Sequence, residues 1–251
     1  MVFRDNPWPA GTPCWVDLGT DVERAVSFYT GLFGWDIQVG GEEVGGYGQA
    51  FLDGKVVAGF GPLQDPSQPT AWTTYLASAD LDGDAAKVKG AGGQIVVDPM
   101  DIMEFGRMFI AVDPTGAMFG VWEAGTHYGV QLTNEPGSLS WNEHLSGDLE
   151  AAKDFYAKVF GYSYDEVGGP LSYVTFSLTE GGDAVGGMGA SGVGSWGTYF
   201  NVADTDAAAA LVEELGGRVI DAPESTPFGR MATVADDQGA IFKLIADVPA
   251  R

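Results

Sequence analysis

The stretch Phe28-Tyr29 followed by Phe33-Gly34-Trp35 decides how this chain is organised, because it occurs twice. It returns 127 residues later as Phe155-Tyr156 followed by Phe160-Gly161-Tyr162. A period this long is not that of a solenoid, so we expect each copy to be a folding unit of its own. Three further pairs repeat in the same order, at offsets of 124 and then 123 residues: Trp72 and Tyr75 with Trp196 and Tyr199, Gly92-Gly93 with Gly216-Gly217, and Phe105-Gly106-Arg107-Met108 with Phe228-Gly229-Arg230-Met231.

The composition fits two packed modules with a strongly acidic surface. The 251 residues divide into two units of about 120 residues, an ordinary domain size. There are 12 Lys and Arg against 35 Asp and Glu, which gives a net charge of −23. Such a surface repels phosphate backbones and anionic headgroups, so we expect neither nucleic acid nor membrane as a partner. Solubility explains the acidity most simply, while attraction of a cationic ligand and a salt-tolerant host are alternatives.

The single cysteine and the opening residues predict a location. Cys14 has no second cysteine to pair with, which fits a reducing compartment. The first residues contain no apolar run of signal-peptide length, and no stretch of the chain reaches transmembrane length. We therefore expect a cytoplasmic protein, monomeric or a weak homodimer.

Hydrophobic periodicity predicts the same order of elements in both copies. A strand is followed by a helix that runs from a capping box at Thr20-Asp21-Val22-Glu23 to Gly34. The fold class is α+β, with tandem βαβββ units in a first module at 11–123, a linker at 124–138 and a second module at 139–247. The other elements expected in the first module are strands near 35–39, 46–52, 55–61 and 73–77, a helix near 81–91, and strands near 94–98, 107–112 and 117–122.

This arrangement resembles the vicinal oxygen chelate superfamily, which contains glyoxalase I, bleomycin-resistance proteins and extradiol dioxygenases. The resemblance covers nearly the whole chain and rests on the repeated Phe-Tyr and Phe-Gly opening, the helix ending in Gly-Gly, and the turn Asp113-Pro114-Thr115-Gly116. The motifs Cys14-Trp15-Val16-Asp17-Leu18 and Trp141-Asn142-Glu143 are similar to a two-module actinobacterial subgroup of glyoxalase-like proteins and hydroxylases. The resemblance implies curled mixed sheets that enclose a U-shaped trough, but it implies no single reaction.

The resemblance also implies where metal ligands would lie. The three positions fall on Trp15 and Trp141, near Thr73 and Gly197, and on Gly120 and Lys243. None of these is a usual ligand for a divalent cation, so we expect no metal site and no cofactor. An alternative remains open, in which a rearranged site uses Glu143, His144, Asp17 and Glu123. Strand alternation, however, puts His144 on the face opposite Trp141 and Glu143.

Aromatic and polar residues are the candidates for binding a ligand in the troughs. Pockets with aromatic walls and a few polar groups suit flat, partly apolar ligands. The alternative is that these tryptophans only fill the core. The candidate ligand-binding residues are Trp15, Trp141, Tyr75, Tyr199, Trp122, Met118, Asn201, Arg107 and Arg230.

Asp17 and Glu143 are the candidate catalytic residues, since each is an acid that strand alternation places among aromatic rings. Burial would raise the pKa of such a carboxyl, which suits a general acid or base or the counter-ion of a cationic ligand. Structural pairing with an arginine is the alternative. We expect Arg107 and Arg230 to form salt bridges, with Asp17 and Glu143 as candidate partners. The alternative is that the two arginines clamp an anionic substrate. The segments 100–105 and 223–228 are candidate lids.

These observations predict a glyoxalase-like or bleomycin-resistance-like protein that binds a small, partly aromatic molecule in a trough without a metal. The alternative function is that of a metal-dependent lyase, isomerase, dioxygenase or hydroxylase of the same superfamily.

Overall fold

The computed structural model describes residues 2–63, 65, 67–168, 172–190, 192 and 194–246, so residue 247 of the predicted second module lies outside it. Two modules with the same element order follow a short strand β1 (Val2–Phe3), and β10 (Leu132–Thr133) lies between them. The first comprises β2 (Pro13–Thr20), α1 (Val22–Phe33), β3 (Asp36–Val39), η1 (Glu42–Val44), β4 (Gly48–Leu52), β5 (Lys55–Pro62), β6 (Ala71–Ser78), α2 (Leu81–Gly90), β7 (Gln94–Ile102), β8 (Gly106–Val112) and β9 (Met118–Ala124). The second comprises β11 (Leu139–Ser146), α3 (Leu149–Phe160), β12 (Ser163–Glu166), β13 (Tyr173–Ser177), β14 (Ala184–Ala190), β15 (Ser195–Asn201), α4 (Thr205–Glu214), β16 (Arg218–Thr226), β17 (Gly229–Ala235) and β18 (Ile241–Ala246).

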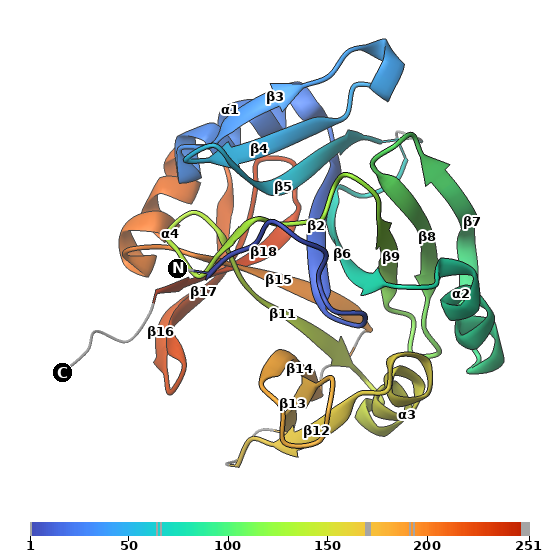
Figure 1. Ribbon diagram of the computed structural model, residues 1–251. Helices are drawn as coiled ribbons and strands as arrows, with labels where there is room; N and C mark the ends of the chain where they lie inside the picture. The colour runs from blue at the N-terminus through green and yellow to red at the C-terminus, as the bar shows by residue number, and fades with distance from the viewer. Residues whose placement is uncertain are drawn as a thin grey trace.

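Each module forms one curled sheet with the same strand order (Figure 1). The first sheet runs β3-β4-β5-β2-β6-β9-β8-β7, and the second runs β12-β13-β14-β11-β15-β18-β17-β16. In both sheets the first strand of the module pairs parallel with one neighbour and antiparallel with the other. The duplication in the sequence is therefore a duplication of the fold.

The four helices have acidic N-caps, since the side chains of Asp21, Asp80, Asp148 and Asp204 each accept a hydrogen bond from the first turn. The predicted cap at Thr20 is wrong by one residue. Gly34 and Gly161 end α1 and α3 in the left-handed conformation. This confirms the predicted end of the first helix at Gly34. No helix of the described residues is long and apolar enough to cross a membrane.

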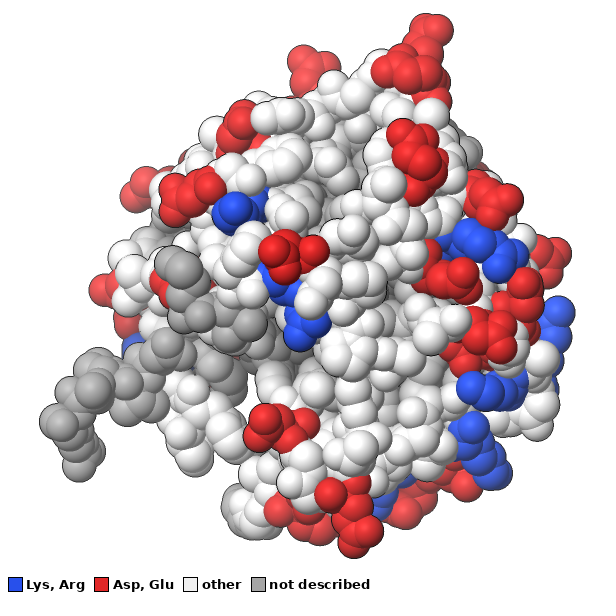
Figure 2. Space-filling model, viewed as in Figure 1, with Lys and Arg blue, Asp and Glu red and all other residues white. Residues whose placement is uncertain are grey.

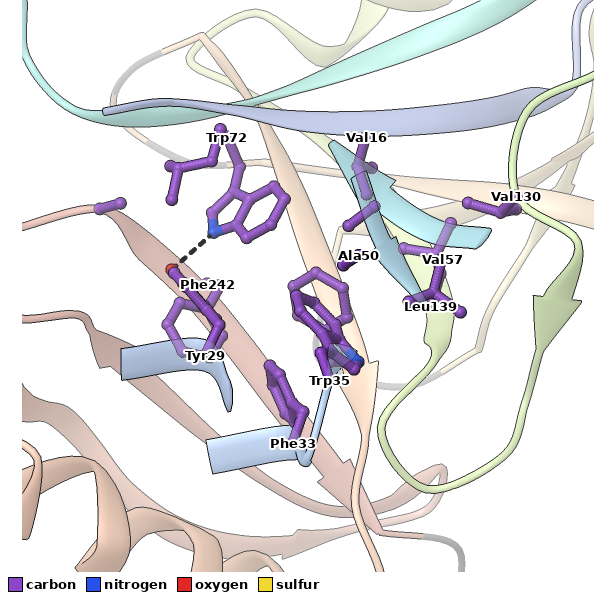
Figure 3. Close-up of a cluster of buried hydrophobic side chains, with 14 of the residues drawn as sticks. Val16, Tyr29, Phe33, Trp35, Ala50, Val57, Trp72, Val130, Leu139 and Phe242 are labelled. Carbon is purple, nitrogen blue, oxygen red and sulfur yellow. Dashed lines mark hydrogen bonds between the residues drawn. The ribbon is translucent and has the colours of Figure 1, made fainter. Parts of the chain in front are cut away.

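The helix-covered faces of the two sheets pack against each other. Strand β6 of the first sheet contacts β15 and β18 of the second, and α1 contacts α4 while α2 contacts α3. Aromatic side chains from both modules interlock between them, as Figure 3 shows for Tyr29, Phe33 and Trp35 with Phe242. Trp72 donates a hydrogen bond from Nε1 to the Tyr29 hydroxyl within this cluster. Because this core spans both modules, the two copies stabilise each other.

Two buried aspartates join the modules at equivalent turns. Tyr29 of α1 donates to Asp236, and Tyr156 of α3 donates to Asp113, each at 3.1 Å. His144 adds a 2.7 Å bond from Nε2 to the Asp113 carboxylate, and both side chains are fully buried. This confirms that His144 lies on the face opposite Trp141 and Glu143.

The candidate lids are not separate loops. Residues 100–102 belong to β7 and residues 223–226 belong to β16, and each pairs with the following strand. Both hairpins extend the sheet instead of folding over it. Figure 2 shows Asp and Glu side chains around much of the rim of the visible face, Lys and Arg side chains at its right edge and left of its centre, and an uncharged area to the right of the centre.

Candidate ligand-binding site

The face of each sheet that points away from its helices is called here its trough face. Paired residues on neighbouring strands point to the same face, so the strand register defines which side chains share it. Trp15 of β2 pairs with Tyr75 of β6. Tyr75 pairs with Gly120 of β9, and Gly120 pairs with Ile110 of β8. In module two the corresponding row begins with Trp141, Tyr199 and Lys243 and continues to Thr233.

Module one holds a hydrogen-bonded group of aromatic rings around one carboxylate. Trp15 donates from Nε1 to the Tyr47 hydroxyl at 3.0 Å. Tyr47 and Tyr75 then donate to Oδ2 of Asp17 at 3.3 and 3.1 Å. Burial raises the pKa of Asp17 to about 6, although the two tyrosine hydroxyls favour the ionised form. A carboxyl of this kind can accept a proton or receive a positive charge near neutral pH.

The rest of trough face one is apolar and partly open. Ile110 pairs with Val97 on the edge strand, and Trp122 pairs with Met108, which pairs with Met100. Trp122 is buried, but Met100 and Val97 are 46% and 36% exposed. Met118 lies on the same face and is 52% exposed. Water-exposed apolar side chains that form one surface are typical of a binding face.

The linker after β9 closes one side of trough face one. Trp122 donates from Nε1 to the backbone oxygen of His127 at 2.9 Å. The His127 ring packs edge-on against Trp15, with ring centroids 4.4 Å apart. Burial lowers the pKa of His127 to about 4, so its ring is neutral at pH 7. Val130 donates its backbone N–H to Cys14 and holds the linker beside β2.

Module two repeats the aromatic group but adds a cation. Trp141 donates from Nε1 to the Tyr173 hydroxyl at 3.0 Å, as Trp15 does to Tyr47. Glu143 takes the place of Asp17, and the Lys243 ammonium donates to it at 2.5 Å. Lys243 also donates to the Tyr199 hydroxyl at 2.9 Å. The carboxylate of module two is therefore paired within the protein.

The outer strands of trough face two carry polar residues. Thr233 and Asp221 occupy the positions of Ile110 and Val97, and Glu224 occupies that of Met100. Asp221 and Glu224 are exposed. The same register therefore supports an apolar wall in one module and a charged wall in the other.

Arg107 and Arg230 lie on the helix side of the sheets and not on the trough faces. Arg107 donates to Asp101 and Asp82 at 3.0 and 3.1 Å, and Arg230 forms an ion pair with Asp206. Asp82 and Asp206 lie in the first turns of α2 and α4, on the helix side of the sheets. The arginines therefore link these helices to β8 and β17. They pair neither with Asp17 nor with Glu143.

The remaining candidates lie on the trough faces, but they differ in exposure. Trp15, Tyr75, Tyr199 and Trp122 are buried, Trp141 is half-buried, and Met118 is exposed. Asn201 is two residues from Tyr199 on the same strand and is 3% exposed. The sequence analysis missed Tyr47 and Tyr173, whose offset of 126 residues fits the repeat and would have revealed them.

The donors of the chain do not fit a metal ion at the family's positions. The Lys243 ammonium occupies one of these positions in module two, and Gly120 offers no donor in module one. The structure does not bring the residues of the rearranged site together, since His144 binds Asp113 and Glu123 accepts from the backbone of Leu81 on the helix side. Within the described part of the chain, no three His, Cys, Asp or Glu side chains are grouped to hold a metal.

The comparisons with known proteins identify the family. The model of the Glyoxalase/Bleomycin resistance protein/Dioxygenase superfamily matches residues 18–121 and 143–244, one segment in each module. This chain belongs to that superfamily. It is 40% identical to "Putative glyoxylase CFP32" of Mycobacterium tuberculosis (strain CDC 1551 / Oshkosh), over 98% of either chain. It is 38% identical to the anthracycline biosynthesis protein DnrV of Streptomyces peucetius, over 94% of this chain and 93% of the other.

Solved structures of the superfamily share the fold at low sequence identity. The Mn(II)-bound glyoxalase from Novosphingobium aromaticivorans aligns with a TM-score of 0.67 at 15% identity, over 94% of this chain and 82% of the other. The 2,3-dioxygenase LapB from Pseudomonas sp. KL28 aligns with a TM-score of 0.64 at 12% identity, over 94% and 93%. These likenesses establish the architecture of paired βαβββ units.

Proposed function

We propose that this protein binds a small, partly aromatic molecule on the trough face of module one and does so without a metal. The observation that carries this proposal is the apolar wall of Val97, Met100, Met108, Ile110 and Met118, which stays partly exposed in a protein of net charge −23. Leaving such side chains in water costs about 25 cal/mol for each Å² of apolar surface, so a ligand that covers them gains affinity.

The chemistry of the wall selects the ligand. Methionine side chains adapt to irregular apolar shapes, and their sulfur atoms contact aromatic rings favourably. Trp15, Tyr47, Tyr75 and Trp122 lie beside this wall on the same face and bring a few fixed polar atoms to it. An apolar lining with few polar groups is typical of sites for small organic molecules.

A depression adjoins this face at the end of β2 and β5. It has a volume of about 900 Å³ and is open to solvent. Leu63 lines the depression and also lies against Gly19, which continues the trough face beyond Trp15 and Asp17. Its lining contains none of the residues of the apolar wall or of the aromatic group, so binding at the wall does not require it.

The relatives support this class of ligand. The Streptomyces proteins are named for anthracycline biosynthesis, and anthracyclines are flat, multi-ring aromatic compounds. A metal-free binding role also agrees with module two, where the Glu143 carboxylate is paired with Lys243. Among the described residues, no other His, Cys, Asp or Glu side chains join Glu143 to form a group that could hold a metal.

Titration with N-phenyl-1-naphthylamine, a neutral apolar probe that fluoresces when bound, tests the proposal. We expect saturable binding with one site per chain, and the same Kd after dialysis against EDTA. Val97→Asp, which introduces the residue of module two, should weaken binding at least 10-fold. The matched control is Ile241→Thr, which removes an exposed apolar side chain from module two and should change nothing. The proposal fails if the probe does not saturate, if EDTA abolishes binding, or if both variants behave alike.

A further inference from the structure

The Asp17 carboxylate lacks the positive partner that its counterpart has. Its hydrogen-bond donors are the hydroxyls of Tyr47 and Tyr75, and the side chain is only half-buried. In the part of the chain that the structure describes, no Lys, Arg or His side chain forms an ion pair with it. A carboxylate among aromatic rings without a cation is costly to ionise, and it is stabilised by any positive charge that reaches it.

Module two shows where that positive charge belongs. Tyr199 pairs in register with Lys243, and Tyr75 pairs in the same register with Gly120. Lys243 reaches from this position to Glu143, and its ammonium also lies 4.9 Å from the centre of the Tyr199 ring. A β-carbon on Gly120 would lie 2.1 Å from a ring carbon of Tyr75, so this position in module one has no room for a lysine of its own.

We propose that the ligand of trough face one is an arylalkylamine, an aromatic ring that carries a basic aliphatic amine, whose protonated nitrogen binds Asp17 as the Lys243 ammonium binds Glu143. This inference rests on the proposed function and adds the chemical class of the ligand. The flat ring of the ligand covers the apolar wall of Ile110 and Met108, and its ammonium reaches the partly exposed carboxylate of Asp17. Cations bind favourably both to carboxylates and to aromatic faces.

The surroundings of Asp17 favour a cation over other ligands. Burial and the nearby charge of Asp17 hold the pKa values of Tyr47 and Tyr75 well above their usual range, so both remain neutral donors. His127, which packs on Trp15, is neutral at pH 7 because burial lowers its pKa to about 4. The surface of net charge −23 attracts cations and repels anions over the whole molecule.

Two probes of similar shape distinguish the contribution of the positive charge to affinity from that of the aromatic ring. The probes are 1-naphthylmethylamine, which is protonated at pH 8, and 1-naphthylmethanol, which is neutral. Titration calorimetry in 0.5 M NaCl suppresses attraction by the general surface charge. We expect the wild-type protein to bind the amine at least 10-fold more tightly than the alcohol. Asp17→Asn should abolish this preference by weakening amine binding while alcohol binding stays the same.

The control is Asp221→Asn, which removes an exposed acid from trough face two and should keep the preference. Equal affinity of the wild-type protein for both probes, or an unchanged preference in Asp17→Asn, overturns the inference while binding of N-phenyl-1-naphthylamine still supports the proposed function. If that probe also fails to bind, the proposed function fails with it. Circular dichroism checks folding, and Asp17→Ser replaces Asp17→Asn if the latter does not fold.

Discussion

The two trough faces are built on one plan and differ in how each carboxylate is neutralised. Each face has a tryptophan that donates to a tyrosine, an acid beside them, and a second tyrosine on the next strand. In module two a lysine of the chain pairs with the acid, and in module one no cation of the described residues does. The comparison teaches that the two copies of a duplicated fold can diverge at one position, so that one acid has a cationic partner within the chain and the other has only hydroxyl donors.

The outer strands diverge in the same direction. Val97, Ile110 and Met100 of module one correspond to Asp221, Thr233 and Glu224 of module two. An apolar wall beside an unpaired acid suits an apolar cation, whereas polar residues beside an internal ion pair remain hydrated. The apolar lining therefore occurs beside the carboxylate without an ion pair, and the polar lining occurs beside the carboxylate that is paired with lysine.

The largest effect is expected when the ion pair of module two is broken. Glu143→Gln leaves the Lys243 ammonium without its carboxylate, and removal of one partner of a buried pair costs up to about 3–5 kcal/mol. Because Lys243 is 25% exposed, water relieves part of this cost, and we expect a loss of about 2–3 kcal/mol in the free energy of unfolding by urea. The double variant Glu143→Gln with Lys243→Met should regain at least half of it. A single variant within about 0.5 kcal/mol of the wild type would contradict the assigned pairing.

A smaller effect is expected at the contact between the modules, where the two copies also differ. Burial opposes ionisation of Asp113. The hydrogen bond and the electrostatic interaction with His144, together with hydrogen bonds from Thr115 and Ala117, outweigh this effect and hold the pKa of Asp113 below its usual value. At the equivalent turn, burial raises the pKa of Asp236 despite backbone donors.

His144→Leu removes the imidazole partner of Asp113 and should cost about 2 kcal/mol at pH 7, since a buried carboxylate loses a hydrogen-bond partner. The depressed pKa of Asp113 stabilises the wild type above the unfolded pKa near 3.8, and this contribution disappears as the pH falls through the folded pKa. The difference between variant and wild type should therefore shrink in acid. A difference that does not depend on pH in urea unfolding between pH 3 and 7 would show that His144 acts by packing alone.

The smallest effect, of opposite sign, is expected at Asp17. A raised pKa means that ionisation of Asp17 destabilises the folded protein as the pH rises from about 3.8 through about 6. Asp17→Asn removes this cost and should add about 1 kcal/mol to the free energy of unfolding at pH 8, with no gain at pH 4. Thermal unfolding at both values measures it. A loss of stability at pH 8 would mean that the protein itself supplies the missing cation.

The repeat in the sequence was sufficient to predict the two modules, the order of their elements and the superfamily. Helix ends were predictable where a local signal decides them, as at Gly34. Strand β7 is longer than the predicted 94–98, and both β7 and β16 contain bulges, which disturb the simple alternation of exposed and buried residues. That irregularity explains why residues 100–105 and 223–228 read as loops.

The partners of charged side chains were not predictable, because they depend on distant segments. Arg107 and Arg230 pair with acids in the first turns of α2 and α4 instead of with Asp17 and Glu143. Lys243 meets Glu143 across 100 residues of sequence, and only the register of β15 and β18 brings them together. The trough positions of Trp15, Trp141 and both acids, in contrast, follow from strand alternation alone.

The measurement that tests the central comparison most directly is a carbon-13 NMR titration of the Asp17 carboxyl, assigned by the loss of its signal in Asp17→Asn. We predict a midpoint near pH 6 in the free protein, and a lower midpoint when 1-naphthylmethylamine is bound, because the ammonium favours the carboxylate. A midpoint near 3.8 that the amine does not move would contradict the account, since Asp17 would then be a hydrated or already paired acid.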